Sequence, residues 1–226
     1  SGPGVSNLET GLVTATDEGD PVLAISGQVK RSDLLKRSHQ SMKNVAMMEP
    51  VTKYAVEVHD PNTLSETIAN AYRVAKSGKR GASFVSIPQD VTDSLVSVKA
   101  IKQLTDPTLG SASVDDVNYL AQAIRNADLP VLLLGNGAST RAVTNAIRKL
   151  LEAVKLPVVE TFQGAGIVSR ELEEDTFFGR VGLFRNQPGD MLLKKADLVI
   201  AIGYDPIEYE ARNWNAEISA RIIVID

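Results

Sequence analysis

Short apolar runs alternate with amphipathic stretches along most of this chain. The runs are too short for helices and are typical of strands buried on both faces, whereas apolar residues between them recur at helical spacing. We expect strands at 21–26, 53–58, 82–87, 130–134, 156–161, 197–202 and 221–226. Strands separated by helices imply parallel sheets covered on both sides, so the pattern predicts an α/β fold.

The expected helices begin and end at recognisable signals. Asp60 caps a helix that starts at Pro61 and stops before Gly78, and Ser113 with Asp116 forms a capping box. Further helices are predicted over 4–16, 143–154 and 187–195. Residues 30–50 are polar without an apolar period, and a glycine-punctuated loop is expected between 161 and 187.

The apolar period is lost between about 92 and 112, as in an interdomain connector. We therefore predict a first domain at 1–92, a linker at 93–112 and a second, doubly wound domain at 113–226. The first sheet lacks opening strands and the last strand stops at Asp226, so the chain is expected to be an internal piece of a longer protein.

Composition excludes several classes of function. The formal charge of −4 gives no electrostatic reason to expect a nucleic-acid partner. There is no cysteine and there are only two histidines, which excludes disulfides, thiolate chemistry and a histidine-rich metal site. No apolar run approaches the roughly 20 residues of a membrane span, and the N-terminus does not resemble a signal peptide. We expect a cytoplasmic protein with no membrane partner.

Two glycine-containing turns are candidates for ligand binding. Ser1–Asn7 holds a Gly-Pro-Gly turn that leads into a helix, so its backbone N–H groups can face a ligand. Gly135-Asn136-Gly137 follows a strand and opens a helix, as in dinucleotide-binding folds, but Thr140 replaces the third glycine. Glu160 satisfies the usual downstream acidic position only loosely, and we favour a tight turn without a ligand.

The Ser1–Asn7 turn, Gly27-Gln28-Val29, Ile87-Pro88-Gln89-Asp90 and Gly203-Tyr204-Asp205-Pro206 together resemble the thiamine-diphosphate-dependent acetolactate synthases, most closely the catabolic branch. The resemblance implies a partial thiamine-pyrimidine-binding domain followed by a doubly wound parallel-sheet central domain. It also implies condensation of two pyruvates to 2-acetolactate with release of CO2, with thiamine diphosphate and Mg²⁺ as cofactors. A homotetramer built from two dimers is implied, because each active site of this family needs two chains.

The same resemblance assigns roles to individual residues. Gln40 is the implied catalytic residue, offering a neutral amide to pyruvate, although by pattern alone it lies in a surface loop. Gly2, Gly4 and Asn7 are the implied cofactor-binding residues. His39 replaces a phenylalanine of anabolic relatives and Gln89 replaces a lysine, and both are expected at the substrate pocket, with a plain strand-end role as the alternative for Gln89. Arg31 and Lys36 either guide a carboxylate substrate or are solvated loop charges.

Other family features are expected to be absent from this chain. The acidic stretch from Tyr204 to Glu210 would repel a pyrophosphate, so we expect no FAD. The family's activating glutamate belongs before Ser1 and its metal-anchoring motif belongs after Asp226, so the chain alone is expected to be inactive and to hold no metal. Two alternatives stay open: a pyruvate oxidase or glyoxylate carboligase, and a non-catalytic nucleotide-binding module.

Overall fold

A computed structural model describes residues 1–34, 36–102, 110–217 and 219–226. The chain divides into two compact units between residues 109 and 110, and each is described here by itself. The predicted linker at 93–112 partly falls in 103–109, outside the described residues; its described parts, 93–102 and 110–112, contain no helix or strand.

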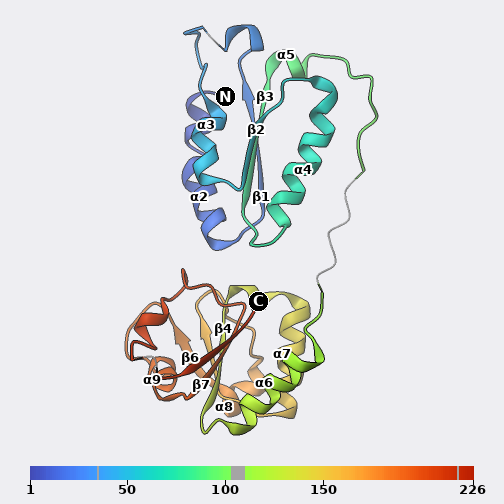
Figure 1. The fold of residues 1–226 in the computed structure, drawn as a ribbon. Helices are drawn as coiled ribbons and strands as arrows, with labels where there is room; N and C mark the ends of the chain where they lie inside the picture. Colours follow the sequence, from blue (N-terminus) through green and yellow to red (C-terminus); the bar gives the residue numbers. More distant parts are fainter. Residues whose placement is uncertain (35, 103–109, 218) are drawn as a thin grey trace. The chain divides into compact units, whose positions relative to one another are not determined.

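The first unit is a three-layer α/β structure around a parallel sheet in the order β1-β3-β2. Its strands are β1 (Val22–Gln28), β2 (Tyr54–Glu57) and β3 (Ala82–Pro88). Its helices are α1 (Pro3–Ser6), α2 (Glu9–Glu18), α3 (Asn44–Met48), α4 (Leu64–Lys76) and α5 (Gln89–Thr92), with 3₁₀ turns η1 (Arg31–Asp33), η2 (Glu49–Val51) and η3 (Pro61–Thr63). Helices α2 and α3 cover one face of the sheet and α4 covers the other (Figure 1).

The alternation of side chains along β3 explains this layering. Phe84 is fully buried against Leu12 and Met48 on the α2/α3 side, whereas Val85 is buried with Ala71 on the α4 side. Successive side chains of a strand point to opposite faces, so a central strand covered on both faces reads as a continuous apolar run.

The second unit is a doubly wound parallel sheet in the order β6-β5-β4-β7-β8. Its strands are β4 (Pro130–Leu134), β5 (Val158–Thr161), β6 (Phe177–Val181), β7 (Leu198–Ile202) and β8 (Arg221–Ile225). Its helices are α6 (Val114–Asn126), α7 (Arg141–Ala153), α8 (Arg170–Thr176) and α9 (Pro188–Lys195), with 3₁₀ turns η4 (Asn136–Ser139) and η5 (Ala211–Asn213). The chain reverses its direction of winding between β4 and β7, and the loops after these two strands contact each other through the hydrogen bond from the N–H of Gly137 to the carbonyl of Gly203 at 2.8 Å.

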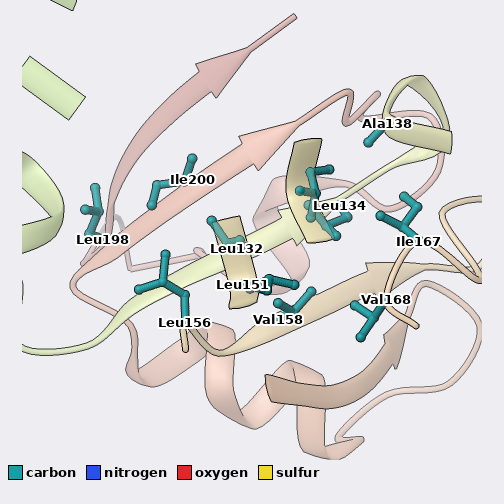
Figure 2. Close-up of a cluster of buried hydrophobic side chains, with 11 residues drawn as sticks. Leu132, Leu134, Ala138, Leu151, Leu156, Val158, Ile167, Val168, Leu198 and Ile200 are labelled. Carbon is teal, nitrogen blue, oxygen red and sulfur yellow. The ribbon is translucent and has the colours of Figure 1, made fainter. Parts of the chain in front are cut away.

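Two apolar layers hold the second unit together. Figure 2 shows the first, in which Leu132 and Leu134 of β4 pack with Leu151 of α7 and with Leu198 and Ile200 of β7. The second layer lies on the opposite face, where Val131 and Leu133 pack with Leu193 of α9 and with Trp214. Trp214 is 2% exposed and completes this layer at the end of the sheet, as a packing residue.

Most sequence-predicted elements are present. Each predicted strand forms, and the Ser113–Asp116 capping box is made in both directions. The predicted helix at 4–16 divides into α1 and α2, because the N–H of Leu8 donates to the carbonyl of Val5, three residues back. None of the helices within the described residues has the length and apolarity that a bilayer span requires.

Four helices or strands were not predicted, and one of them is α5, directly after β3. Helix α8 and strand β6 lie in the segment expected to be a glycine-punctuated loop, and α3 lies in the polar stretch at 30–50. The prediction failed at β6 because it is an edge strand, in which Gly179 and the exposed Arg180 interrupt the apolar residues.

Candidate functional site

The first unit brings Gly2 and Gln40 into direct contact. Gly2 has a φ of +54°, and a Cβ added there would lie 2.7 Å from the Cβ of Gln40. The hydroxyl of Ser1 donates a 2.8 Å hydrogen bond to Oε1 of Gln40, which itself has a φ of +64°. Two segments 39 residues apart in the sequence are thus joined in one small cluster.

This cluster lies at the carboxyl end of β1. A Cβ on Gly27, near the end of that strand, would lie 3.9 Å from the Cβ of Ser1. His39 and Gln40 are both exposed in the loop that follows the strand. Ligands of open parallel sheets bind outside the carboxyl ends of the strands, so this is the place where a site is expected.

The Ser1–Asn7 turn is partly closed on itself. The N–H of Val5 donates to the carbonyl of Gly2 at 2.8 Å, and the N–H of Gly4 donates to the carbonyl of Ser1 at 3.3 Å. A Cβ added at Gly4 would meet no atom within 4 Å, so the turn is open on that side. The N–H groups of Gly4 and Val5 are therefore used within the turn. What the turn presents to a ligand is mainly the uncovered backbone at Gly4.

Asn7 belongs to a groove beside the turn. An open groove of about 480 Å³ runs between α2 and β1 and is lined by Asn7, Leu8, Gly11, Leu12, Val22, Ala24 and Ile25. Its lining is mostly apolar, and Ile25 is 53% exposed. The groove follows the edge of the sheet formed by β1.

A charged clasp ties the loop after β1 to the end of β3. The carboxylate of Asp90 accepts from the backbone N–H of Arg31 at 3.0 Å and from its Nε at 2.7 Å. These bonds from Arg31 hold the pKa of the Asp90 carboxyl below its usual value. Arg31 therefore pairs with Asp90 and orders the loop, and its role as a guide for a carboxylate substrate stays a prediction.

The other predicted residues of this region lie near the clasp. Gln89 is exposed at the start of α5, directly after β3, next to the strand end of β1. Lys36 is exposed and pairs with Asp33 at 3.0 Å, which agrees with the reading of a solvated loop charge.

A buried polar network below the loop was not predicted. Gln28 is 3% exposed, and its Nε2 donates to the carbonyl of Met42 at 2.7 Å and to Glu57 at 3.2 Å. Ser86 donates to the same Glu57 oxygen at 3.0 Å, and Asn44 donates to Ser86 at 3.2 Å. The signal for this network in the sequence would have been a polar residue at or near the end of each strand, namely Gln28, Glu57 and Ser86. The network fixes the loop that carries Gln40, because buried polar groups need their partners.

In the second unit, Glu160 binds backbone N–H groups of its own chain. Its carboxylate accepts from the backbone N–H groups of Val168 at 2.8 Å and Gly166 at 3.3 Å, and Arg180 lies 3.6 Å away. Burial raises the pKa of this carboxyl. Glu160 points into the unit and anchors the loop after β5, so it does not fill the ribose-binding role of a dinucleotide site.

Asp190, in helix α9, also has a structural role. It is 1% exposed, accepts from the hydroxyl of Tyr209 at 2.7 Å, and caps α9 through the N–H of Gln187 at 2.9 Å. Within the described residues, no group of three or more histidine or acidic side chains could hold a metal ion.

Comparison with protein families defines the class of the second unit. Residues 117–226 match the family described as "Thiamine pyrophosphate enzyme, central domain". The chain therefore carries the central domain of a thiamine pyrophosphate enzyme, on the doubly wound sheet described above.

Individual relatives narrow this class. The chain is 51% identical over 226 residues to "Acetolactate synthase" of Bacillus subtilis (strain 168), covering 100% of this chain and 40% of that protein. It is 47% identical over 228 residues to "Acetolactate synthase, catabolic" of Raoultella terrigena, again covering 100% and 40%. A "Probable acetolactate synthase large subunit" of Methanocaldococcus jannaschii is 28% identical over 235 residues.

The chain is thus a homologue of acetolactate synthases, catabolic enzymes included, along its whole length. It spans about 40% of the length of the two relatives with the highest identity given above.

The neutral hydrogen-bonding groups near the Ser1–Asn7 turn are of a kind that suits the neutral aminopyrimidine ring of thiamine diphosphate. Gln40 and Asn7 present exposed neutral amides, and the backbone at Gly4 is open to an approaching group. The described residues contain no acidic cluster that would hold the Mg²⁺ of a diphosphate.

Proposed function

We propose that this chain is part of an enzyme that condenses two molecules of pyruvate to 2-acetolactate with release of CO2. The observation that carries the proposal is 51% and 47% identity to acetolactate synthases over both units of the chain. The contact between the Gly2 turn and Gln40 supports it, because it places a polar, neutral side chain at the strand ends.

Gln40 is the proposed substrate-binding residue. Its Oε1 accepts from Ser1, so the N–H groups of its Nε2 are the donors that it can offer to a ligand. A donor of this kind suits the carboxylate or carbonyl oxygen of pyruvate and adds no positive charge that would oppose loss of CO2. His39 and Gln89 are proposed to line the same pocket.

Gly2, Gly4 and Asn7 are proposed to contact thiamine diphosphate. When bound, this cofactor supplies the electron sink that decarboxylation of a 2-keto acid requires. Gly2 holds the side chain of Gln40 in place from one side, and the open backbone at Gly4 leaves room for a flat ring. In the complete enzyme we propose Mg²⁺ bound outside the described residues, a cytoplasmic location and a dimer of dimers.

The direct test is the reaction of the full-length protein. Purified enzyme with pyruvate, thiamine diphosphate and Mg²⁺ is expected to form acetolactate, measured after acid conversion to acetoin. The protein is expected to be colourless and to need no added flavin. Peroxide formation from pyruvate, a preference for glyoxylate, or stoichiometric flavin in the purified protein would contradict the proposal in favour of a related thiamine enzyme.

The isolated chain of 226 residues provides a second test. It is expected to form no acetolactate above a buffer control and to bind thiamine diphosphate with Mg²⁺ only weakly, because the described residues offer no metal site. Turnover by the isolated chain would show that the residues at the end of β1 are sufficient by themselves.

A further inference from the structure

Residues at the carboxyl ends of β4, β5 and β7 converge on a single carboxylate in the second unit. The carboxylate belongs to Glu208, in the segment that follows β7. Because the sheet reverses its winding between β4 and β7, this is the position at which doubly wound folds normally receive a ligand.

The donors around Glu208 come from the loops after β4 and β7 and from the last residue of β5. The backbone N–H of Asn136 lies 3.1 Å from Oε1 and 3.2 Å from Oε2 of Glu208. The N–H of Asp205 lies 3.2 Å from Oε1, and the hydroxyl of Thr161 donates to Oε2. Backbone N–H groups and hydroxyls in a concave arrangement are the donors that bind phosphate oxygens in proteins.

Glycines in the loop after β4 allow another segment of the chain to lie close to the backbone of this loop. A Cβ on Gly135 would lie 2.5 Å from the carbonyl oxygen of Gly203 and 2.8 Å from Oε1 of Glu208. Gly203, with a φ of +56°, would place a Cβ 2.2 Å from the nitrogen of Ala138. The glycines that would let a pyrophosphate approach the backbone instead admit the segment that carries Glu208.

Side chains hold the segment of Glu208 in this position. The hydroxyl of Tyr204 donates to the carbonyl of Tyr209, and the hydroxyl of Tyr209 donates to the buried carboxylate of Asp190 at 2.7 Å. Thr161 is 1% exposed and accepts from the N–H of Gly164 at 3.0 Å, which directs its proton toward Glu208. Further hydrogen bonds therefore hold in place both the segment that carries Glu208 and the hydroxyl of Thr161 that donates to it.

We propose that Glu208 is an internal anion that occupies a phosphate-binding cradle and thereby excludes nucleotide phosphates from the second unit. Its two carboxylate oxygens use the donors that two phosphate oxygens would use, and its negative charge opposes a second anion at the same place. Removal of the carboxylate exposes the donors and turns the cradle into a site for pyrophosphate groups. This inference does not depend on the reaction proposed above.

The test uses Glu208→Ala in the 226-residue chain, with inorganic pyrophosphate and ADP as probes. Thermal unfolding is followed by the fluorescence of Trp214, the single tryptophan, which lies in the second unit and contacts Tyr204 with ring centroids 6.2 Å apart. The variant is expected to melt at a lower temperature than the wild type. Pyrophosphate and ADP are expected to restore its melting temperature in a saturable way, with an affinity about tenfold or more above that of the wild type.

Glu210→Ala is the matched control. It makes the same change of charge two residues further along, but Glu210 is exposed and pairs only with Arg212 among the ion pairs of the described residues. The control is expected to show the weak response of the wild type. If Glu210→Ala responded to pyrophosphate and ADP as strongly as Glu208→Ala, the response would come from the change in net charge alone, and the proposal would be overturned.

A second variant covers the case in which Glu208→Ala does not fold. Glu208→Gln keeps the size of the side chain and one acceptor oxygen, and is expected to gain a smaller response to pyrophosphate. Folding of either variant only in the presence of pyrophosphate supports the cradle. Variants that are folded without any gain in binding, or that stay unfolded with and without pyrophosphate, would show that the donors cannot accept an external anion.

Discussion

Gly2 and Gln40 lie in such close contact that there is no room for a side chain at residue 2. An added Cβ would lie 2.7 Å from the Cβ and 3.0 Å from the Cα of Gln40. One of these atoms belongs to the backbone, so rotation of the glutamine side chain cannot relieve the contact. The position of the loop that carries Gln40 thus depends on the absence of a side chain at residue 2.

Gly2→Ala is therefore expected to destabilise the first unit by about 1–3 kcal/mol, the cost of a strained backbone region for a residue other than glycine. Gly4→Ala is the control, because its Cβ meets nothing within 4 Å and alanine favours a helix. His39 and His59 are the only histidines and both lie in the first unit, so their NMR signals in urea report its unfolding. Equal midpoints for the two variants would refute the close contact.

Gln40→Ala is expected to lower the rate of acetolactate formation in the full-length enzyme. A hydrogen bond from a neutral donor to a charged group contributes about 1.5–3 kcal/mol and one between neutral groups about 0.5–1.5, so we expect a loss of roughly three- to a hundredfold. Gln122→Ala makes the same chemical change at an exposed position of α6 and is expected to leave the rate unchanged. If kcat and KM of Gln40→Ala equal those of Gln122→Ala, Gln40 is a surface residue.

Glu160 is expected to make the stability of the second unit depend on pH in an unusual direction. Burial raises its pKa in the folded state, so the contribution is fully present below the unfolded value of about 4.3 and is lost as pH rises through the folded pKa. Glu160→Gln is expected to flatten this fall in the urea midpoint between pH 4 and neutrality, measured by Trp214 fluorescence.

Two other carboxyls of the unit act in a different pH range. The pKa values of Asp197 and Glu171 are lowered by hydrogen bonds, first those from the backbone of Asp128 to Asp197 and from the backbone of Glu171 to its own side chain. Their contributions are lost below about pH 4 and do not overlap with that of Glu160. Glu152→Gln, at an exposed site of α7, is the control, and a slope unchanged by Glu160→Gln would contradict the assignment.

Strand β1 is expected to exchange its outward amide hydrogens faster than β3. Strand β3 is paired on both sides, whereas β1 pairs only with β3 among the described strands, and Ile25 on it is 53% exposed. Amides that face an unpaired edge are open to water, so they exchange without unfolding of the sheet. Exchange of the isolated chain measured by NMR tests this, and equally slow exchange across both strands would show that the edge is covered in solution.

The α/β class and most of the elements could be predicted from the amino-acid sequence, because each signal is local. Buried strands such as 82–87 and 197–202 read as apolar runs, and the Ser113–Asp116 capping box needs only four neighbouring residues. The motifs in the first turn and at the strand ends also indicated the acetolactate synthases, and the comparisons confirmed that relation. The roles of Gln40, Gly2, Gly4 and Asn7 stay predictions.

Which residues contact one another depends on the folded arrangement of the strands and loops. Contact of Gly2 with Gln40, the clasp of Arg31 on Asp90 and the binding of Glu208 by residues at the ends of three strands all join residues far apart in the chain. Such pairings depend on strand order and register, which no local pattern contains. The same acidic stretch that predicted repulsion of a pyrophosphate could not reveal that one carboxylate fills the cradle, because its donors, at Asn136 and Thr161, become its neighbours only when the sheet has formed.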